Sequence, residues 1–305
     1  MAAAINWATL LEEQAAKLKD KTFLYVVYQD RSISYQDMDL NANRIANFLL
    51  NLGAAPGDGI AILMNNSPEF LDIFFGIQKI GMYVNTVNTS LRGDQLTYTI
   101  DNSDTKFLVV DHDLIDIYQG VAAKTPKVER VIVNTLEAPA GFRVPKGMID
   151  LKDAYSKDIS TTKPKVKFDE SSILMLMYTS GTTGLPKGVV MRYNKNIIER
   201  LRMIAGVLLK PDSVYYTALQ LFHGNALYVT TTSSLIVGCT VALSKRFSAS
   251  RFWEEIAKSR ATVFNTIGGI IPILMKTPET AYEKQHRVEK VLSAGCPAAL
   301  WEPFE

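Results

Sequence analysis

Apolar positions along the chain follow two spacings in turn, and each spacing predicts one kind of element. Between Leu40 and Leu52 they recur close to every 3.6 residues, the period of a helix with one buried face, and Gly53 follows where such a helix ends. The uncharged run Ile60 to Met64 is short and continuous, as in a parallel strand that is covered on both faces. The chain therefore begins as alternating helices and strands.

The same patterns continue along most of the chain. They predict helices over 1–18, 34–52, 68–81, 94–102, 114–123 and 196–209, and strands over 22–28, 60–64, 82–87, 107–110, 128–133, 173–178, 189–191 and 240–243. Strands that alternate with helices specify an α/β fold with mostly parallel sheets flanked by helices. We expect this fold class for the whole chain.

Composition places one boundary inside this pattern. Between Glu137 and Asp169 the chain shifts to Pro, Gly, Lys, Ser and Thr, which is typical of an exposed connector. We therefore expect a first α/β subdomain over 1–160 and a second, incomplete one over 161–305. Residues 297–305 look like a helix that has only begun, so we expect the chain to be the front part of a longer protein.

Charge and cysteine content exclude several classes of function. The 33 Lys and Arg against 31 Asp and Glu leave a formal net charge of +2, so no overall field attracts nucleic acid. Cys239 and Cys296 lie far apart without metal-ligand spacing, and we interpret both as reduced, buried side chains. The sequence shows neither a signal peptide nor a transmembrane segment, since polar residues interrupt the long uncharged window 213–244. We expect a cytoplasmic protein and leave a homo-oligomer open.

The strongest chemical signal is the segment Tyr178 to Gly188, which reads YTSGTTGLPKG. Its glycines let backbone N–H groups approach an anion, its hydroxyls can donate to phosphate oxygens, and Lys187 adds a positive charge. The composition fits a polyphosphate cradle, although a polar surface turn has the same residue types. The Walker A pattern is not met, because Pro186 precedes Lys187 and Gly188 follows it.

This segment closely resembles the phosphate-loop signature of the adenylate-forming enzymes, which include acyl-CoA synthetases, peptide-synthetase adenylation domains and beetle luciferases. Other segments are similar to that superfamily in the same order along the chain, namely Gly57-Asp58, Asn65-Asn66-Ser67-Pro68-Glu69-Phe70, Gly76 to Gly81, Asn88 to Leu91, Leu221 to Ala226 and Leu292 to Pro297. The resemblance covers nearly the whole chain and implies the large N-terminal domain of such an enzyme.

The resemblance also implies a two-step reaction. A substrate carboxylate attacks the α-phosphate of Mg-ATP to give an acyl-adenylate and pyrophosphate, and the thiolate of coenzyme A then displaces AMP. Such transfers depend on positioning and fixed positive dipoles more than on a protein nucleophile. The implied cofactors and co-substrates are ATP, Mg²⁺ and coenzyme A, and the partner is a small-molecule carboxylic acid.

Carried over residue by residue, the resemblance assigns roles as follows. The β- and γ-phosphates fall to Thr179, Ser180, Gly181, Thr182, Thr183, Gly184 and Lys187, the adenine side to Gly295, Cys296 and Pro297, the acyl pocket to His223, Gly224, Asn225, Gly268 and Gly269, and the coenzyme A side to Lys245, Arg246 and Phe247. Lys187 and His223 are the expected catalytic residues. Lys245 to Phe247 equally fit a solvated basic turn, and the paired glycines equally fit close backbone packing.

Two departures from the superfamily pattern bear on activity. Arg192-Tyr193 stands where a Ser/Thr-His pair is common. The segments that serve ribose and magnesium, and the small C-terminal domain with its adenylation lysine, have no counterpart here, so we expect no metal site and little turnover from these residues alone.

Three classes of function stay open at this point, namely an adenylate-forming enzyme of one of two branches, a non-catalytic nucleotide-binding protein and a P-loop NTPase. An acid:CoA ligase for a fatty, alicyclic or aromatic acid is favoured, because Gly224 to Thr240 carries no charge that could hold a substrate amine. The alternatives are an adenylation domain of another branch and a non-catalytic nucleotide-binding fragment. A P-loop NTPase ranks third because of the Walker A mismatch.

Overall fold

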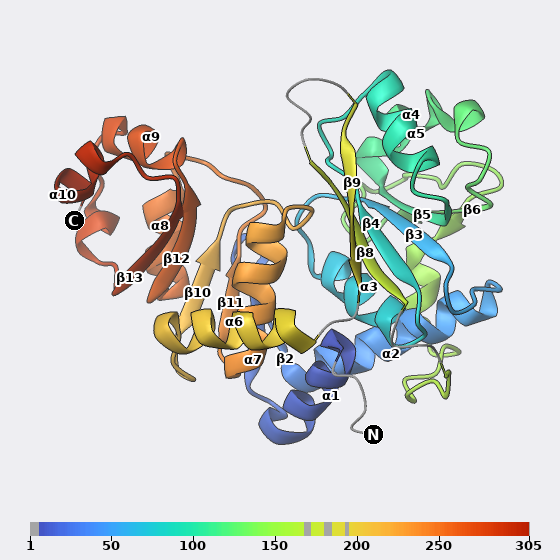
Figure 1. Cartoon of the computed structure of the whole chain (residues 1–305), viewed down its shortest axis with the longest axis horizontal. Coiled ribbons are helices and arrows are strands. Elements are labelled where there is room, and N and C mark those ends of the chain that lie inside the picture. The colour runs from blue at the N-terminus through green and yellow to red at the C-terminus, as the bar shows by residue number, and fades with distance from the viewer. Residues whose placement is uncertain (1–5, 168–171, 180–184, 193–194, 305) are drawn as a thin grey trace. The chain divides into compact units, whose positions relative to one another are not determined.

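The computed structural model describes residues 6–167, 172–179, 185–192 and 195–304, and Figure 1 shows its helices and strands. The helices are α1 Trp7–Leu18, α2 Tyr35–Asn51, α3 Pro68–Gln78, α4 Gly93–Asp101, α5 Ile115–Gln119, α6 Lys195–Leu208, α7 Ser233–Val237, α8 Phe252–Ser259, α9 Ile270–Lys276 and α10 Trp301–Phe304. The strands are β1 Thr22–Val26, β2 Arg31–Ser34, β3 Gly59–Leu63, β4 Tyr83–Thr86, β5 Thr105–Asp111, β6 Arg130–Asn134, β7 Ile149–Asp150, β8 Ile173–Thr179, β9 Lys187–Arg192, β10 Val214–Thr217, β11 Thr240–Leu243, β12 Val263–Ile267 and β13 Lys290–Ala294.

Most strand pairs are parallel, which confirms the expected fold class. One sheet runs in the order β7-β6-β5-β3-β4-β8-β9 and the other in the order β13-β12-β10-β11-β1-β2. Only the pairs β1 with β2 and β8 with β9 are antiparallel in the described part of the chain. Every residue of β3 is buried, as expected for a parallel strand covered on both faces.

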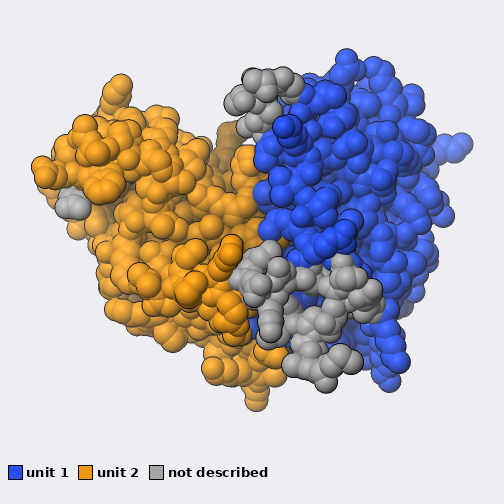
Figure 2. Space-filling model, viewed as in Figure 1, with its two compact units in different colours: residues 1–12, 37–65, 69–195 blue, residues 13–36, 66–68, 196–305 orange. Residues whose placement is uncertain are grey.

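The boundary expected at 160/161 is corrected by the contacts along the chain. The chain forms two compact units (Figure 2), one of residues 1–12, 37–65 and 69–195 and the other of residues 13–36, 66–68 and 196–305. The strand β8 pairs with β4 in the first sheet, so the hairpin that bears the predicted phosphate loop belongs to the first unit. Conversely, β1 pairs with β11 in the second unit, with Leu24 opposite Val241. Hydrophobic periodicity carries no information about which sheet a strand joins.

The first unit is held by apolar layers on its sheet. Leu96 and Ile100 of α4 pack with Ile115 and Tyr118 of α5 on Leu108 and its neighbours in the sheet. The helices α2 and α3 approach closely, because a Cβ added to Gly76 would stand 2.8 Å from the Ala42 carbonyl oxygen. Gly53 ends α2 with φ of +89°, in the left-handed region that glycine adopts without steric cost.

The second unit has apolar packing on both faces of its sheet. On one face, Phe252 and Ile256 of α8 and Leu274 of α9 pack on Tyr216 and Phe264. On the other face, Ala205 of α6 and Val237 of α7 belong to a second cluster with Tyr215, Cys239 and Val263. Helices on both faces are what crossover connections between parallel strands produce.

Two local expectations changed. Cys239 is buried and free, as predicted, whereas Cys296 is free but only half-buried, because it lies in a loop after the edge strand β13. The residues after Gly224 form a π-helix over Asn225–Thr232, which periodicity did not predict. Within the described residues, no helix is both long and apolar enough to span a bilayer.

Candidate active site

The predicted acyl, coenzyme A and adenine residues follow successive strands of the second sheet. His223 comes after β10, Lys245 after β11, Gly268 after β12 and Gly295 after β13. These four strands pair in parallel, so their carboxyl ends meet at one edge of the sheet. The structure thus brings together, within one unit, four segments that are up to about seventy residues apart.

The centre of this edge lies between β10 and β12. The chain runs from β10 to β11 on one side and then crosses back to β12 on the other, which makes this a topological switch point. Open α/β sheets bind ligands outside the carboxyl ends of their strands at such points. Here Asn265 of β12 donates from Nδ2 to Oδ1 of Asn225 at 2.7 Å. The hydrogen bond closes the switch point beside the predicted acyl residues.

His223 is presented by a tight turn and the start of the π-helix. Its backbone N–H donates to the Gln220 carbonyl at 3.0 Å, and its own carbonyl accepts from Leu227 at 3.1 Å. The imidazole tilts against the buried Phe222 ring at 4.5 Å between centroids. Its side chain is exposed. π-helical turns are rare in proteins, and those that occur are frequently found at functional sites.

The imidazole is expected to stay neutral to lower pH than a free histidine. Removal of water by the surrounding protein lowers the pKa of His223 from the ordinary 6.5, although part of the ring is open to solvent. The folded protein therefore binds a proton at His223 less readily than the unfolded chain does. As a result, the free energy of unfolding decreases as the pH falls below 6.5.

We expect an NMR titration of the His223 ring signals to have its midpoint below 6.5 in the folded protein and near 6.5 in urea. The free energy of unfolding of His223→Gln is expected to decline less than that of the unmodified chain between pH 7 and pH 5.5, over the range about pH 6.5 in which a histidine titrates. A folded midpoint at or above the unfolded one would contradict this assignment.

The residues predicted for coenzyme A separate into two kinds. The Lys245 ammonium lies over the Tyr28 ring, 5.1 Å from its centroid, and Arg246 is exposed. Phe247 instead packs on Phe252, with ring centroids 6.1 Å apart, and so supports the core. Two cationic side chains thus stand after β11, the arrangement that an anionic ligand requires.

Backbone geometry explains why glycine stands at positions 268 and 295. A Cβ at Gly268 would lie 2.2 Å from the Gly295 carbonyl oxygen, so the backbone after β12 touches the backbone after β13. Gly295 has φ of +87°, and the Gly268 N–H donates to Ala294 O at 2.9 Å. A Cβ at Gly269 would meet nothing within 4 Å. Close backbone packing therefore explains Gly268, and open space remains beside Gly269.

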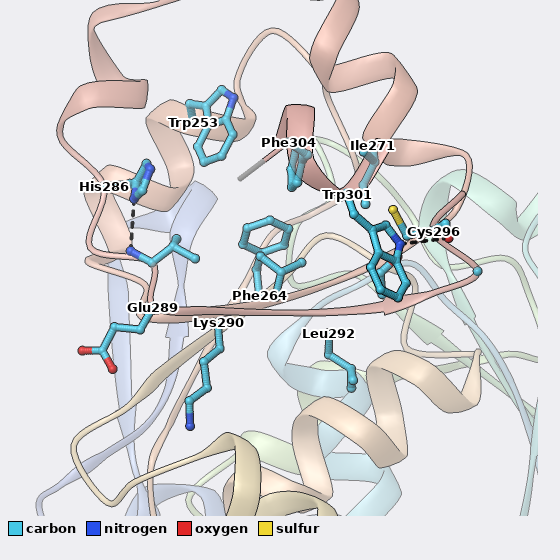
Figure 3. A pocket seen from close by; sticks show the side chains of 14 residues that line it. Trp253, Phe264, Ile271, His286, Glu289, Lys290, Leu292, Cys296, Trp301 and Phe304 are labelled. Atoms are coloured by element: carbon cyan, nitrogen blue, oxygen red, sulfur yellow. Dashed lines mark hydrogen bonds between the residues drawn. The ribbon is translucent and has the colours of Figure 1, made fainter. Parts of the chain in front are cut away.

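A cavity of about 760 Å³ adjoins the same edge and is shown in Figure 3. Gly295 and Cys296, two of the three residues predicted for the adenine side, line it. Trp253, Phe264 and Phe304 supply aromatic walls. Trp301 donates from Nε1 to the Cys296 carbonyl at 3.2 Å. A cavity of this size with aromatic walls and several polar side chains, His286, Glu289 and Lys290 among them, suits a small organic ligand.

The predicted phosphate loop belongs to the first unit, where its two ends are described. Thr179 of β8 stands opposite Lys187 of β9, and Tyr178 stands opposite Gly188. The Tyr178 hydroxyl donates to Asn102 Oδ1 at 2.9 Å, and burial raises its pKa to about 12. A Cβ at Gly188 would lie 3.2 Å from the Tyr178 ring, so glycine lets that ring pack against the stem.

Lys187 is exposed at the end of this hairpin. The described element that follows the loop is the strand β9, whereas P-loop enzymes place phosphates at the N-terminus of a following helix. The other predicted phosphate ligands, Ser180, Gly181, Thr182, Thr183 and Gly184, lie outside the described residues. Tyr193 of the unusual Arg192-Tyr193 pair does so too.

The described part of the chain holds no cluster of side chains that could bind a metal ion by itself. No group of three or more His, Cys, Asp or Glu side chains is placed there to hold a metal ion. Magnesium in nucleotide sites takes carboxylates together with substrate phosphates. We therefore derive no step through this ion.

Sequence reasoning did not single out two residues of the site. Sequence reasoning gives Asn265 no role of its own, and Asn66 is only one residue of a segment that is similar to the superfamily. Both side chains are buried, at 2% and 0% exposure. Asparagine inside an apolar strand, or directly after a buried one, is the signal that could have marked them, because buried polar groups need partners.

Comparison with protein families gives a match to the model described as AMP-binding enzyme over residues 11–305. Among relatives, the chain is 31% identical to the medium/long-chain-fatty-acid–CoA ligase FadD6 of Mycobacterium tuberculosis over 301 residues, which is 97% of this chain and 47% of that protein. It is 32% identical to the long-chain fatty acid transport protein 6 of Mus musculus over 292 residues, 92% of this chain and 45% of that protein. The chain thus spans about half the length of these relatives.

Solved structures show the same fold. The anthranilate CoA ligase AuaEII in complex with anthranoyl-AMP superposes with a TM-score of 0.88 at 22% identity, covering 99% of this chain and 57% of that one. The N-terminal domain of FACL13 from Mycobacterium tuberculosis gives a TM-score of 0.84 at 24% identity, covering 97% and 72%.

Proposed function

The chain belongs to the AMP-binding enzyme family, and from this premise we propose that the complete protein is an AMP-forming carboxylic acid:CoA ligase. In the first step a carboxylate oxygen attacks the α-phosphorus of ATP, and the bond to the β-phosphate bridging oxygen breaks to release pyrophosphate. In the second step the thiolate sulfur of coenzyme A attacks the acyl carbon, and AMP leaves with the electron pair of the broken carbon–oxygen bond.

The observation that carries this proposal is the shared edge of the second sheet. An acid ligase must hold an acyl group, an adenylate and a thiol close together, and the residues proposed for these roles follow adjacent parallel strands. Such an edge can position reactants without a protein nucleophile. A non-catalytic nucleotide-binding remnant would not require these separate segments to meet.

Each group in this edge has a proposed task. The exposed His223 imidazole, whose pKa is lowered by its surroundings, lies against the carboxylate or adenylate, and Gly269 leaves room for the acyl group. Lys245 and Arg246 take the nucleotide part of coenzyme A, and Gly295, Cys296 and Pro297 the adenine side. On the hairpin of the first unit, Thr179 and Lys187 bind the β- and γ-phosphates with Ser180 to Gly184.

The acid is proposed to be uncharged beyond its carboxylate. Gly224 to Thr240 contains no ionisable carboxylate or ammonium group, and the relative at 31% identity is named as a ligase of medium- and long-chain fatty acids. ATP with Mg²⁺ is proposed as the co-substrate, and the cytoplasm as the site of action.

The experiment that tests this function is acid-dependent exchange of labelled pyrophosphate into ATP by the complete product of the gene that encodes this chain. A panel of fatty, alicyclic, aromatic and amino acids is scored, followed by thioester formation with coenzyme A. We expect exchange with at least one uncharged acid and thioester with the same acid. Exchange with amino acids alone would favour an adenylation domain, and ATP binding without exchange would favour a non-catalytic protein.

A further inference from the structure

Asn66 is a buried side chain that holds two loops of the candidate site with one amide group. Its Nδ2 donates to the Leu219 carbonyl and to the Ser244 carbonyl, both at 2.9 Å. Its Oδ1 accepts from the Leu221 N–H at 2.8 Å. All three distances are typical of well-formed hydrogen bonds, and Asn66 has 0% exposure.

The two loops held in this way carry different parts of the site. Leu219 and Leu221 lie in the loop after β10, within four residues of His223. Ser244 directly precedes Lys245 and Arg246 in the turn after β11. A single amide therefore joins the proposed acyl side to the proposed coenzyme A side.

The surroundings of Asn66 strengthen the same connection. Its main-chain carbonyl accepts from the Tyr28 hydroxyl at 3.3 Å, and the Tyr28 ring supports the Lys245 ammonium. Gln220 donates from Nε2 to the Lys245 carbonyl at 3.4 Å, a longer bond than any made by the Asn66 side chain. The backbone of Asn66 contacts Tyr28, which supports Lys245, and its side chain bonds to Ser244, the residue before Lys245.

We propose that Asn66 is a positioning residue that sets His223 and Lys245 at a fixed separation through its three buried hydrogen bonds. This inference rests on the proposed function for its catalytic consequence, but its geometric part concerns the folded chain alone. Carbonyl oxygens of Leu219 and Ser244 repel each other unless a donor stands between them, and the amide supplies that donor to both. Asn fits because it alone combines two N–H donors with an acceptor on so short a side chain.

The test compares Asn66→Asp and Asn66→Ala with a matched control, Asn85→Asp. Asn85 is also 0% exposed and donates to the Thr99 carbonyl at 3.0 Å, within the first unit. Asn66→Asp keeps the acceptor for Leu221 and loses both donors, whereas Asn66→Ala loses all three bonds. The control therefore reports the general effect of a buried Asn-to-Asp change.

Two readouts separate positioning from mere stability. We expect the ring signals of His223 to shift in NMR spectra of both Asn66 variants and to stay in place in the control. In the complete protein, we expect kcat/KM for the acid and for coenzyme A to fall by about 10-fold, as the loss of a hydrogen bond of average strength implies, with the KM for ATP unchanged.

The outcomes distinguish this inference from the proposed function. If the unmodified complete protein shows no acid-dependent exchange, the function fails, while the His223 signals still decide the role of Asn66. If folded Asn66→Ala leaves those signals where they are, the inference is overturned. Should neither variant fold, slow hydrogen exchange at the Leu221 amide of the unmodified chain is the remaining test, and rapid exchange there would overturn the inference as well.

Discussion

Replacing Lys79 by methionine is expected to lower the free energy of unfolding by about 3 kcal/mol, the effect of removing one partner from a buried ion pair. The Lys79 side chain has 0% exposure, and its ammonium lies 2.7 Å from both Glu12 Oε1 and Asp39 Oδ1. Those carboxylates keep 20% and 19% exposure, so methionine would leave two poorly hydrated negative charges. The urea unfolding midpoint measures the loss.

Lys163→Met is the matched control for this prediction. Lys163 bonds the other oxygen of Glu12 at 2.6 Å, but its side chain is 63% exposed. Ion pairs at the surface contribute about 0–1 kcal/mol, so the control should shift the midpoint little. Equal shifts for Lys79→Met and Lys163→Met would show that burial is not what makes the first interaction strong.

Lys187→Ala in the complete protein is expected to slow acid-dependent pyrophosphate exchange by about 10- to 100-fold. A hydrogen bond to a charged group contributes about 1.5–3 kcal/mol, and every 1.36 kcal/mol corresponds to about a factor of ten in rate. The exchange rate of Lys187→Arg should lie between those of the unmodified protein and Lys187→Ala, because a guanidinium keeps the positive charge but has a different shape from an ammonium group. Initial rates of exchange at saturating acid provide the measurement.

The control for Lys187 is Lys146→Ala, an exposed lysine of the same unit before β7. It removes the same charge from the protein without touching the hairpin. We expect its exchange rate to equal that of the unmodified protein. An unchanged rate for Lys187→Ala would remove the phosphate-loop assignment, whereas equal slowing in both variants would point to overall charge.

Local pattern was sufficient for most elements of the fold. The helix predicted over 34–52 is α2, ended by Gly53 as expected, and the apolar run 60–64 is β3 within one residue. Both depend on short-range terms, namely apolar spacing and backbone conformation. The π-helix Asn225–Thr232 was not predicted, because apolar spacing does not register the bonds that the hydroxyls of three consecutive threonines make to carbonyls of that segment.

For the candidate site, motif similarity named His223, Lys245 and Lys187 but not their supports. Asn66 bonds to Leu219 and Ser244, which are 153 and 178 residues away in the sequence. Asn265 bonds to Asn225, which is 40 residues away. No local pattern marks such partners.

The sequence by itself determined the class of fold, the alternation of helices and strands over much of the chain, and the residues with suitable chemistry, because these follow from periodicity and side-chain type. Only the tertiary structure decided that β8 and β9 join the first sheet, that β1 joins the second, and that one buried asparagine ties the loop of His223 to the turn of Lys245. Pairing between strands is a choice among distant partners with similar apolar surfaces. The packing of the whole chain makes that choice, and the position of every site residue follows from it.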